Sequence, residues 1–302
     1  MSHPEAEQTQ AGIIVDAPAE ITYAMLVDVA NWPLLYPWIA HTEFVERAPA
    51  EDLVQFWAVN PLGRIRIWTS RRYLDASALR MDIEQQGSVG PITGLTGSWT
   101  FKPLPGDRCL VESRHAFHAA TPEDRAAGVT ELNRHGKLQM ETLKSRVENR
   151  ARLAEVTWSF EDSLVVESEL GQVYRALRDV GSWPAHLPYL TALEVTEDEN
   201  DVQFYDVRTQ DADESSRYVR ICLPDKGIAY KQLTVTAPVD LHLGRWTLTE
   251  TPAGVAVTST HTVLVNPSAA EQLPELRGRL HKTLSADSLA ELQLVKRLTE
   301  TH

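Results

Sequence analysis

The chain has 302 residues, of which 43% are hydrophobic, and a formal net charge of −13 at pH 7. This length predicts about two domains, each long enough to bury a core of its own. The negative charge excludes nucleic acid as a general partner, because phosphate binding needs a basic surface. No stretch approaches the roughly 20 apolar residues of a membrane-spanning helix, so we expect a cytoplasmic protein that does not bind membranes.

Residues 1–11 are polar, and we expect them to form a short disordered tail rather than a targeting segment. The two cysteines, Cys109 and Cys222, lie in strand-like runs, one in each half of the chain. In a cytoplasmic protein such cysteines are typically free buried thiols. We therefore expect neither a disulfide nor a metal site at these positions.

A short pattern occurs twice and indicates that the chain repeats one domain. Trp-Pro-Leu-Leu-Tyr-Pro-Trp at 32–38 returns as Trp-Pro-Ala-His-Leu-Pro-Tyr at 183–189. Each copy follows a helical pattern and precedes strand-like sequence. The spacing is too long for a solenoid, so we predict two domains, at residues 12–152 and 153–302.

In the first half, Asp16 is expected to cap a short helix that Trp32-Pro33 ends, because proline disfavours helix at the preceding residue. Strands with a two-residue period follow, with a hairpin turn at 60–63, a loop at 87–97 and a last strand at 109–117. Thr121 then begins a long helix that extends to about Arg150.

The second half repeats this order. A first strand is predicted at 157–166 and a helix at 170–180, and six strand-like runs lie between 193 and 265. A long helix is predicted over 269–298. Because an antiparallel sheet with one apolar face needs a helix to cover it, we predict an α+β fold in which each curved sheet surrounds its long C-terminal helix.

The alternation of side chains along residues 109–117 places His115 on the apolar face, together with Ser113. His261 and Ser259 repeat this arrangement in the second half. Such a histidine is either a core residue satisfied by the protein or a proton-transfer residue, and the sequence leaves both interpretations open. A metal site is not expected, because His115 and His118 point to opposite faces and no third ligand has suitable spacing.

Another set of polar residues shares one face of the strand that follows the first hairpin turn. The set comprises Arg64, Arg66, Trp68, Ser70 and Arg72. Either the arginines are solvated and the intervening isoleucines are core, or this face lines a pocket in which a guanidinium binds an enolate or ketone oxygen.

Two more candidates come from the turn and the long helix. Tyr36 lies between the first helix and the sheet, where a pocket of this fold opens. Asn133 lies at the edge of the apolar stripe of the long helix and is either a surface residue or a pocket residue. The chain contains no nucleophile motif, phosphate-binding loop or dinucleotide motif.

Together these features resemble the two-domain aromatase/cyclases of bacterial type II polyketide synthases, which belong to the helix-grip superfamily with START and Bet v 1-like proteins. The resemblance rests on the Trp-Pro motif, on residues 63–70 and on residues 132–141. It covers residues 12–298 as two copies. It implies two tandem helix-grip domains, each with an interior cavity between the sheet and the long helix.

The resemblance also implies a function. Such enzymes close the first ring of a poly-β-ketone by an aldol step and aromatise it by loss of water. The substrate is carried by an acyl carrier protein, other polyketide synthase enzymes are partners, and no cofactor is needed. The two-domain form implies a ketoreduced substrate. The alternative is a protein of the same fold that binds or transports a hydrophobic ligand without turnover; inward arginine and histidine side chains favour chemistry.

The resemblance assigns roles to residues of the first half. His115 is expected to move the proton, Arg64 or Arg66 to steady the enolate, and Tyr36 and Asn133 to orient the ketone or the leaving hydroxyl. The other residues expected to bind substrate are Trp68, Ser70, Ser113 and Met140. The second half keeps His261 and Tyr189, with Arg217 and Arg220 as its nearest basic residues, and the sequence leaves open whether it is catalytic.

Overall fold

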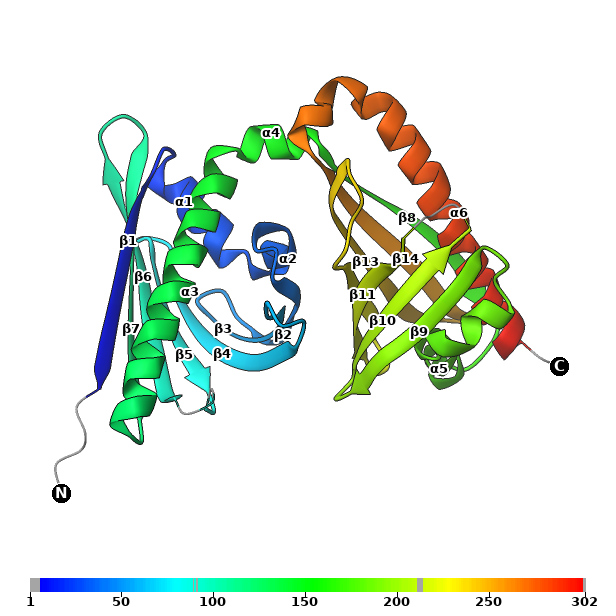
Figure 1. Cartoon of the computed structure of the whole chain (residues 1–302), viewed down its shortest axis with the longest axis horizontal. Helices are drawn as coiled ribbons and strands as arrows, with labels where there is room; N and C mark the ends of the chain where they lie inside the picture. Colours follow the sequence, from blue (N-terminus) through cyan, green and yellow to red (C-terminus); the bar gives the residue numbers. More distant parts are fainter. Residues whose placement is uncertain (1–5, 89, 91, 211–213, 301–302) are drawn as a thin grey trace. The chain divides into compact units, whose positions relative to one another are not determined.

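The computed structural model describes residues 6–88, 90, 92–210 and 214–300. The chain divides into two compact units, residues 1–151 and 152–302, so the boundary lies one residue from the expected position. Within the described residues each unit contains a seven-stranded antiparallel sheet and a long helix (Figure 1). The predicted fold class, two tandem helix-grip domains, is confirmed.

The sheet of the first unit has the order β1-β7-β6-β5-β4-β3-β2, so strands β2 to β6 each pair with the next strand along the chain. The first strand then pairs with the last. The elements of this unit are β1 (Glu7–Val15), α1 (Ala19–Val27), the 3-10 helix η1 (Val29–Asn31), α2 (Trp32–Leu35), β2 (Ile39–Arg47), β3 (Glu51–Val59), β4 (Ile65–Asp75), β5 (Arg80–Gln86), β6 (Ile92–Leu104), β7 (Arg108–Ala119) and α3 (Pro122–Glu148).

The second unit repeats this topology with the strand order β8-β14-β13-β12-β11-β10-β9. A short helix, α4 (Arg150–Glu155), spans the boundary between the units. The elements that follow are β8 (Thr157–Val166), α5 (Leu170–Arg178), η2 (Val180–Ala185), β9 (Leu190–Glu199), β10 (Val202–Thr209), β11 (Ser216–Leu223), β12 (Gly227–Gln232), β13 (Val239–Thr251), β14 (Gly254–Val265), η3 (Pro267–Gln272) and α6 (Leu273–Thr299).

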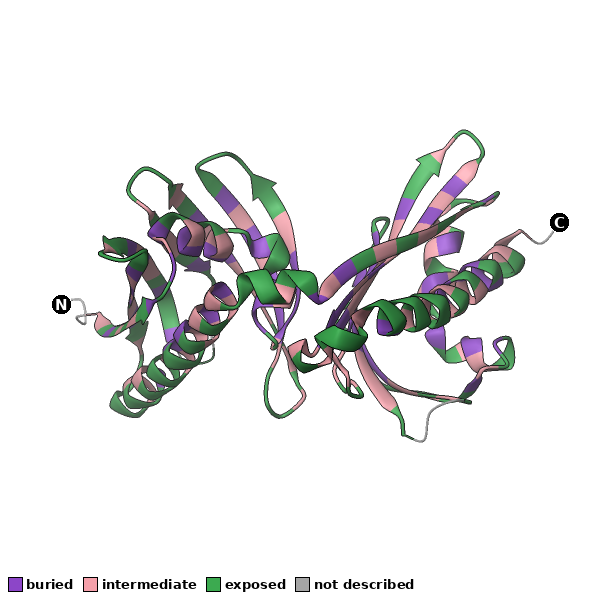
Figure 2. Cartoon of the chain, turned by 90° about the horizontal axis from the view of Figure 1, so that it is seen from above, coloured by how far each residue is buried: buried purple, intermediate pink, exposed green. Residues whose placement is uncertain are grey.

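The long helix of the first unit begins as predicted. The Thr121 side chain accepts a hydrogen bond from the backbone N–H of Asp124, and proline occupies the first turn. The buried side of α3 includes Gly136, Met140 and Leu143, and the helix packs against β1 and β7. Figure 2 shows the same division along both long helices, with exposed residues on one side and buried or partly buried residues on the other. Each long helix therefore closes one side of its curved sheet.

The first strand is the main element that the sequence did not predict. Residues 7–11, expected in a disordered tail, belong to β1, in which Glu7 lies opposite Phe117 of β7. Its sequence is polar, yet Thr9 is buried against the sheet. Asp16 does not cap α1; its backbone N–H donates to the Glu148 carboxylate at 2.7 Å. Of the expected tail, residues 1–5 lie outside the described ranges.

In the first unit the Trp-Pro motif begins a helix rather than ending one, whereas Trp183 and Pro184 lie inside η2. Helix α1 ends at Val27, and Pro33 occupies the first turn of α2, where its missing N–H leaves no bond unmade. The indole N–H of Trp32 donates to the carbonyl oxygen of Leu26 at 2.8 Å, which ties α2 to the end of α1. The predicted loop at 87–97 is also shorter than expected, because β6 begins at Ile92 with a register shift that follows Thr93.

None of the helices in the described ranges has an apolar stretch long enough to cross a membrane.

Candidate functional site

The first unit encloses a cavity of about 640 Å³ between the inner face of its sheet, α2 and α3. This volume is in the range of pockets that bury a drug-sized molecule. One wall is aromatic: Phe56 and Trp68 stack with ring centroids 5.1 Å apart, and Trp32 and Trp38 each lie 5.1 Å from Tyr36. Such a wall offers flat apolar surface to a planar or unsaturated ligand.

His115 lies on the inner face of β7, as predicted, and lines this cavity. Its cross-strand neighbour is Gly97, where a Cβ atom would lie only 2.8 Å from the His115 ring, so glycine leaves the space that the imidazole occupies. In the described part of the chain no side chain hydrogen-bonds either ring nitrogen. Burial, with His135 adding to it, lowers the pKa of His115 to about 4. The imidazole is therefore neutral at pH 7 and able to accept a proton.

Tyr36 places a hydroxyl in the same cavity. Its side chain is fully buried, and burial raises the pKa of Tyr36 above its ordinary value, although interaction with the Gln139 amide opposes this shift. No partner among the described residues lies within full hydrogen-bond distance of the hydroxyl. Tyr36 therefore presents a protonated donor to whatever fills the cavity.

The face of β4 that carries arginines points inward, so the interpretation of this face as a pocket lining is the correct one. Arg66, Trp68, Ser70 and Arg72 line the cavity. Arg64 does not, because it precedes β4 in the turn and is exposed. The guanidinium of Arg66 lies 5.5 Å from the Trp68 ring centroid. Of the two arginines expected to act on the enolate, the structure brings only Arg66 to the cavity.

Arg72 is the buried arginine of this face. It is 2% exposed and makes a bidentate ion pair with Asp52, with N–O distances of 2.7 and 2.6 Å. A further N–H donates to the carbonyl oxygen of Val27 at 3.0 Å. Because Asp52 and the end of α1 satisfy most of its donors, Arg72 joins α1 to the sheet beneath the cavity.

Three expected substrate-binding residues do not line the cavity. Asn133 is exposed, Met140 packs in the hydrophobic core, and Ser113 is buried in β7 away from the lining. Helix α3 instead presents residues spaced four apart, which share one side of a helix. These residues are Glu131, His135 and Gln139. The predicted apolar stripe of this helix is buried at Gly136, Met140 and Leu143, but the polar residues that line the cavity beside it were not predicted.

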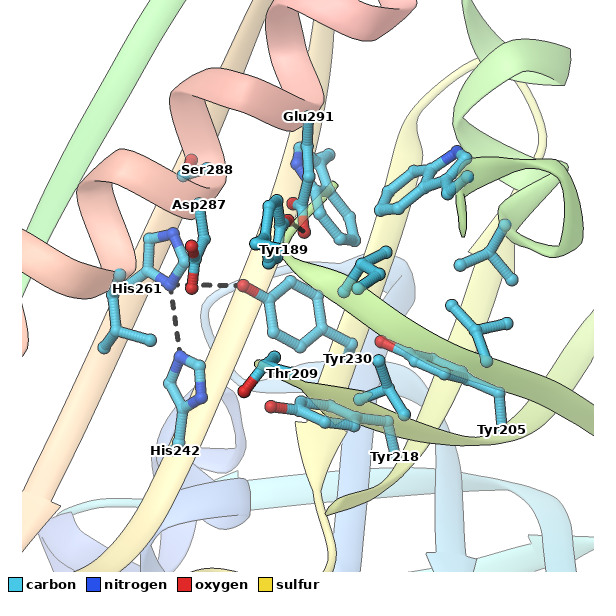
Figure 3. Close-up of a pocket in the computed structure, with 17 residues that line it drawn as sticks. Tyr189, Tyr205, Thr209, Tyr218, Tyr230, His242, His261, Asp287, Ser288 and Glu291 are labelled. Carbon is cyan, nitrogen blue, oxygen red and sulfur yellow. Dashed lines mark hydrogen bonds between the residues drawn. The ribbon is translucent and has the colours of Figure 1, made fainter. Parts of the chain in front are cut away.

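The second unit has a pocket of only about 90 Å³ at the equivalent place. Three inward residues of the first unit are replaced by tyrosines, as the register around Arg72 and Arg220 shows. The tyrosines are Tyr205, Tyr218 and Tyr230, in place of Val54, Ser70 and Ile83. Figure 3 shows their rings side by side in the pocket. Gly244 makes room for Tyr230, since a Cβ atom there would lie 1.9 Å from the Tyr230 ring.

His261 corresponds to His115 but is held by the protein. One ring nitrogen lies 3.1 Å from His242 and 3.2 Å from the Tyr230 hydroxyl (Figure 3). The other lies 3.2 Å from the Ser259 hydroxyl. Burial lowers the pKa of His261 to about 4. The interpretation as a satisfied core histidine therefore describes His261, whereas His115 faces open space.

The other candidates of the second unit also have internal partners. Tyr189 occupies the position of Trp38, not that of Tyr36, and donates to Glu291 at 3.1 Å. Arg217 is paired with Asp206 at 2.8 Å, outside the pocket lining. Arg220 is fully buried and donates to the carbonyl oxygen of Leu177 at 2.6 Å, as the counterpart of Arg72.

Glu291 makes the stability of the second unit depend on pH. Burial raises the pKa of Glu291 to about 8, although the hydrogen bond from Tyr189 opposes the shift. An unfolded chain loses this proton near pH 4.5, so the folded state binds more protons between those values and its stability falls as pH rises. We expect Glu291→Gln to raise Tm at pH 8 by roughly 5 °C or more, and to change it little at pH 4.5, in calorimetric scans. Equal shifts at both pH values would contradict this assignment.

Within the described residues, no group of three or more histidine, cysteine or acidic side chains is arranged to hold a metal ion.

Comparisons with known proteins bear on the family and the fold. Residues 15–135 match the family model described as polyketide cyclase / dehydrase and lipid transport. The actinorhodin polyketide synthase bifunctional cyclase/dehydratase of Streptomyces coelicolor is 30% identical over 97% of this chain and 97% of its own length. The granaticin counterpart of Streptomyces violaceoruber is 30% identical over 96% of this chain and 93% of its own length.

Solved structures agree. The crystal structure of the di-domain ARO/CYC BexL from the BE-7585A biosynthetic pathway superposes with a TM-score of 0.88 at 29% identity, over 98% of this chain and 99% of that one. The di-domain ARO/CYC StfQ from the steffimycin biosynthetic pathway gives a TM-score of 0.86 at 26% identity, over 97% and 98% of the two chains. The similarity therefore spans both domains.

Proposed function

We propose that this chain, which belongs to the family of bifunctional polyketide cyclase/dehydratases, closes and aromatises the first ring of a poly-β-ketone in its first domain. The observation that carries this proposal is a neutral histidine, His115, that lines a cavity of about 640 Å³ together with a buried tyrosine donor. The equivalent histidine of the second domain faces a pocket of only about 90 Å³ and is engaged by its neighbours.

The proposed reaction needs an acid, a base and a place to fold the chain. His115 takes a proton from a methylene group between two carbonyls, where the C–H bond is already acidic, and an enolate forms. The enolate carbon attacks a ketone further along the same chain, and one C–C bond closes the ring. The Tyr36 hydroxyl hydrogen-bonds the ketone oxygen as negative charge develops on it, and the imidazolium returns its proton to give the alcohol.

Aromatisation then removes water from the ring. His115 takes a second proton from the carbon beside the alcohol, the hydroxyl leaves with a proton from the imidazolium, and one water is lost for each C=C bond formed. Arg66, at the cavity wall over Trp68, is the cation placed to steady the enolate. The aromatic wall holds the flat product ring, and no step requires a cofactor.

The relatives are by name parts of polyketide synthases. We propose that this chain likewise works with other polyketide synthase enzymes, and that its substrate arrives ketoreduced on an acyl carrier protein. The cytoplasm, as expected from the sequence, is the proposed location.

A binding or transport role is the second candidate, since the matching family model also names lipid transport. That role requires an enclosed apolar cavity but gives no reason for an unengaged histidine in its wall. The two functions separate in one experiment: the protein is incubated with a minimal polyketide synthase, with and without a ketoreductase, and the products are identified by mass spectrometry. A new dehydrated aromatic product supports the enzyme, whereas an unchanged ligand recovered from the protein supports the carrier.

A further inference from the structure

Two buried polar atoms in the described wall of the first-domain cavity have no hydrogen-bond partner. One is the Tyr36 hydroxyl and the other is the side-chain nitrogen of Gln85. Buried polar groups in folded proteins are nearly always paired, because an unpaired one loses its hydration without compensation. An unpaired group that lines an open cavity is explained if a ligand supplies the partner.

Gln85 lies on β5, and its inward neighbours on that strand are Met81 and Ile83. It is only 8% exposed, and its cross-strand partner is Ser70, which also lines the cavity. The side chain therefore brings an amide into a wall that is otherwise apolar along this strand. A leucine of similar size would fit such a wall without leaving a polar atom unpaired.

The second domain contains a glutamine at the equivalent position, and there the protein satisfies it. Gln232 donates to the Ser216 hydroxyl at 3.1 Å and to the Thr234 carbonyl oxygen at 2.9 Å, and its own oxygen lies 3.1 Å from a nitrogen of His242. The equivalence follows from the register, since Gln85 pairs with Ser70 as Gln232 pairs with Tyr218. Glutamine at this position thus has hydrogen-bond partners in the second domain, the filled copy, whose pocket is small. In the first domain, the hollow copy, its side-chain nitrogen has none among the described residues.

We propose that Gln85 binds substrate: its amide N–H donates to a ketone oxygen of the poly-β-ketone and so fixes which methylene lies beside His115. A neutral amide suits this task, because it holds a ketone oxygen without transferring a proton to it. Tyr36 and Gln85 then hold the chain at two places, and the distance between the two bound carbonyls selects the carbons that join. This role rests on the proposed function of the cavity.

The first test uses heptane-3,5-dione, a β-diketone that cannot close a six-membered ring, as a probe of binding without turnover. Tryptophan fluorescence from the cavity wall reports its Kd. Gln85→Leu removes the donor and keeps the approximate size, so we expect Kd to rise about three- to tenfold, the loss of one hydrogen bond. Tm is expected to stay constant or rise, because the substitution removes an unpaired polar atom from an apolar wall.

The second test uses the full reaction with the minimal synthase. We expect Gln85→Leu to raise KM by a similar factor and to increase the share of products closed between other carbons. Gln232→Leu is the matched control: it removes three internal hydrogen-bond contacts, so it should lower Tm while leaving Kd, KM and the product ratio unchanged.

Two results would overturn the role of Gln85. One is an unchanged Kd and product ratio in Gln85→Leu; the other is weaker binding together with a lowered Tm, which would make the residue structural. Failure of the proposed function looks different, because wild-type protein would then bind the diketone but release no aromatic product in the reaction with the minimal synthase.

Discussion

Replacing His115 with alanine is expected to abolish formation of the aromatic product, with a fall in kcat of about 10²- to 10⁴-fold, the usual contribution of a general base. The effect is chemical rather than structural, because no described side chain depends on a hydrogen bond from this imidazole. Since the pKa of His115 lies near 4, the wild-type base stays neutral from about pH 5 upward. Activity should therefore fall as the pH drops through this pKa. Product analysis by liquid chromatography and mass spectrometry, with circular dichroism to confirm folding, measures both.

The matched control is His261→Ala in the second domain. That histidine contacts His242, Tyr230 and Ser259, so its loss should lower Tm and leave the aromatic product in place. Wild-type levels of product from the His115 variant would remove this residue from the mechanism. Loss of product in the His261 variant, with its fold intact, would move the chemistry to the second domain.

Asp52→Ala is expected to cost about 3–5 kcal/mol of the free energy of unfolding of the first domain, because it leaves the Arg72 guanidinium buried without its counter-charge. The two N–O distances between the Arg72 guanidinium and the Asp52 carboxylate are 2.7 and 2.6 Å, and both residues are almost fully buried. Urea unfolding, followed by fluorescence, measures the loss. Asp52→Asn keeps one acceptor oxygen, so its free energy of unfolding should lie between those of Asp52→Ala and the wild type.

The second domain supplies the control for this prediction too. There Arg220 meets the neutral amide of Gln203 at 3.0 Å and the carbonyl oxygens of Leu177 and Arg178. Gln203→Ala removes one of the hydrogen bonds of Arg220, together with the bonds that the Gln203 amide donates to Arg178 and Asp198, but it removes no counter-charge. We therefore expect a loss of about 1–3 kcal/mol. Equal losses from Asp52→Ala and Gln203→Ala would show that the counter-charge of Arg72 contributes little.

The features that the sequence predicted well are local or repeated. Thr121 caps its helix through a contact only three residues away, and the alternation along β7 places His115 inward because that strand has no bulge around the histidine. The repeat of the Trp-Pro motif predicted two domains, although the motif itself begins a short helix. Such inferences need no knowledge of distant partners.

The features that it missed depend on partners far along the chain or on small differences in phase. The first half of strand β1 is polar and joins the sheet because β7, about a hundred residues later, pairs with it. Arg64 lies outside the cavity because the turn at 60–63 ends one residue later than its strand pattern indicated. Asn133 and His135 differ by two positions on one helix, and that half turn separates solvent from the cavity. Packing against the sheet, rather than periodicity, fixes that rotation.

The glycines opposite the two histidines occupy the same position in the fold but have opposite effects on the cavity. At Gly97 the missing side chain leaves space for the imidazole at the edge of a void, and at Gly244 it lets a tyrosine ring fill that void. The two copies therefore respond differently to mutation. In the hollow copy, larger inward side chains take up reaction volume at little cost in folding, so substrate range can change by single substitutions. In the filled copy the same changes would meet packed rings, so they should lower the stability of that domain instead of changing specificity.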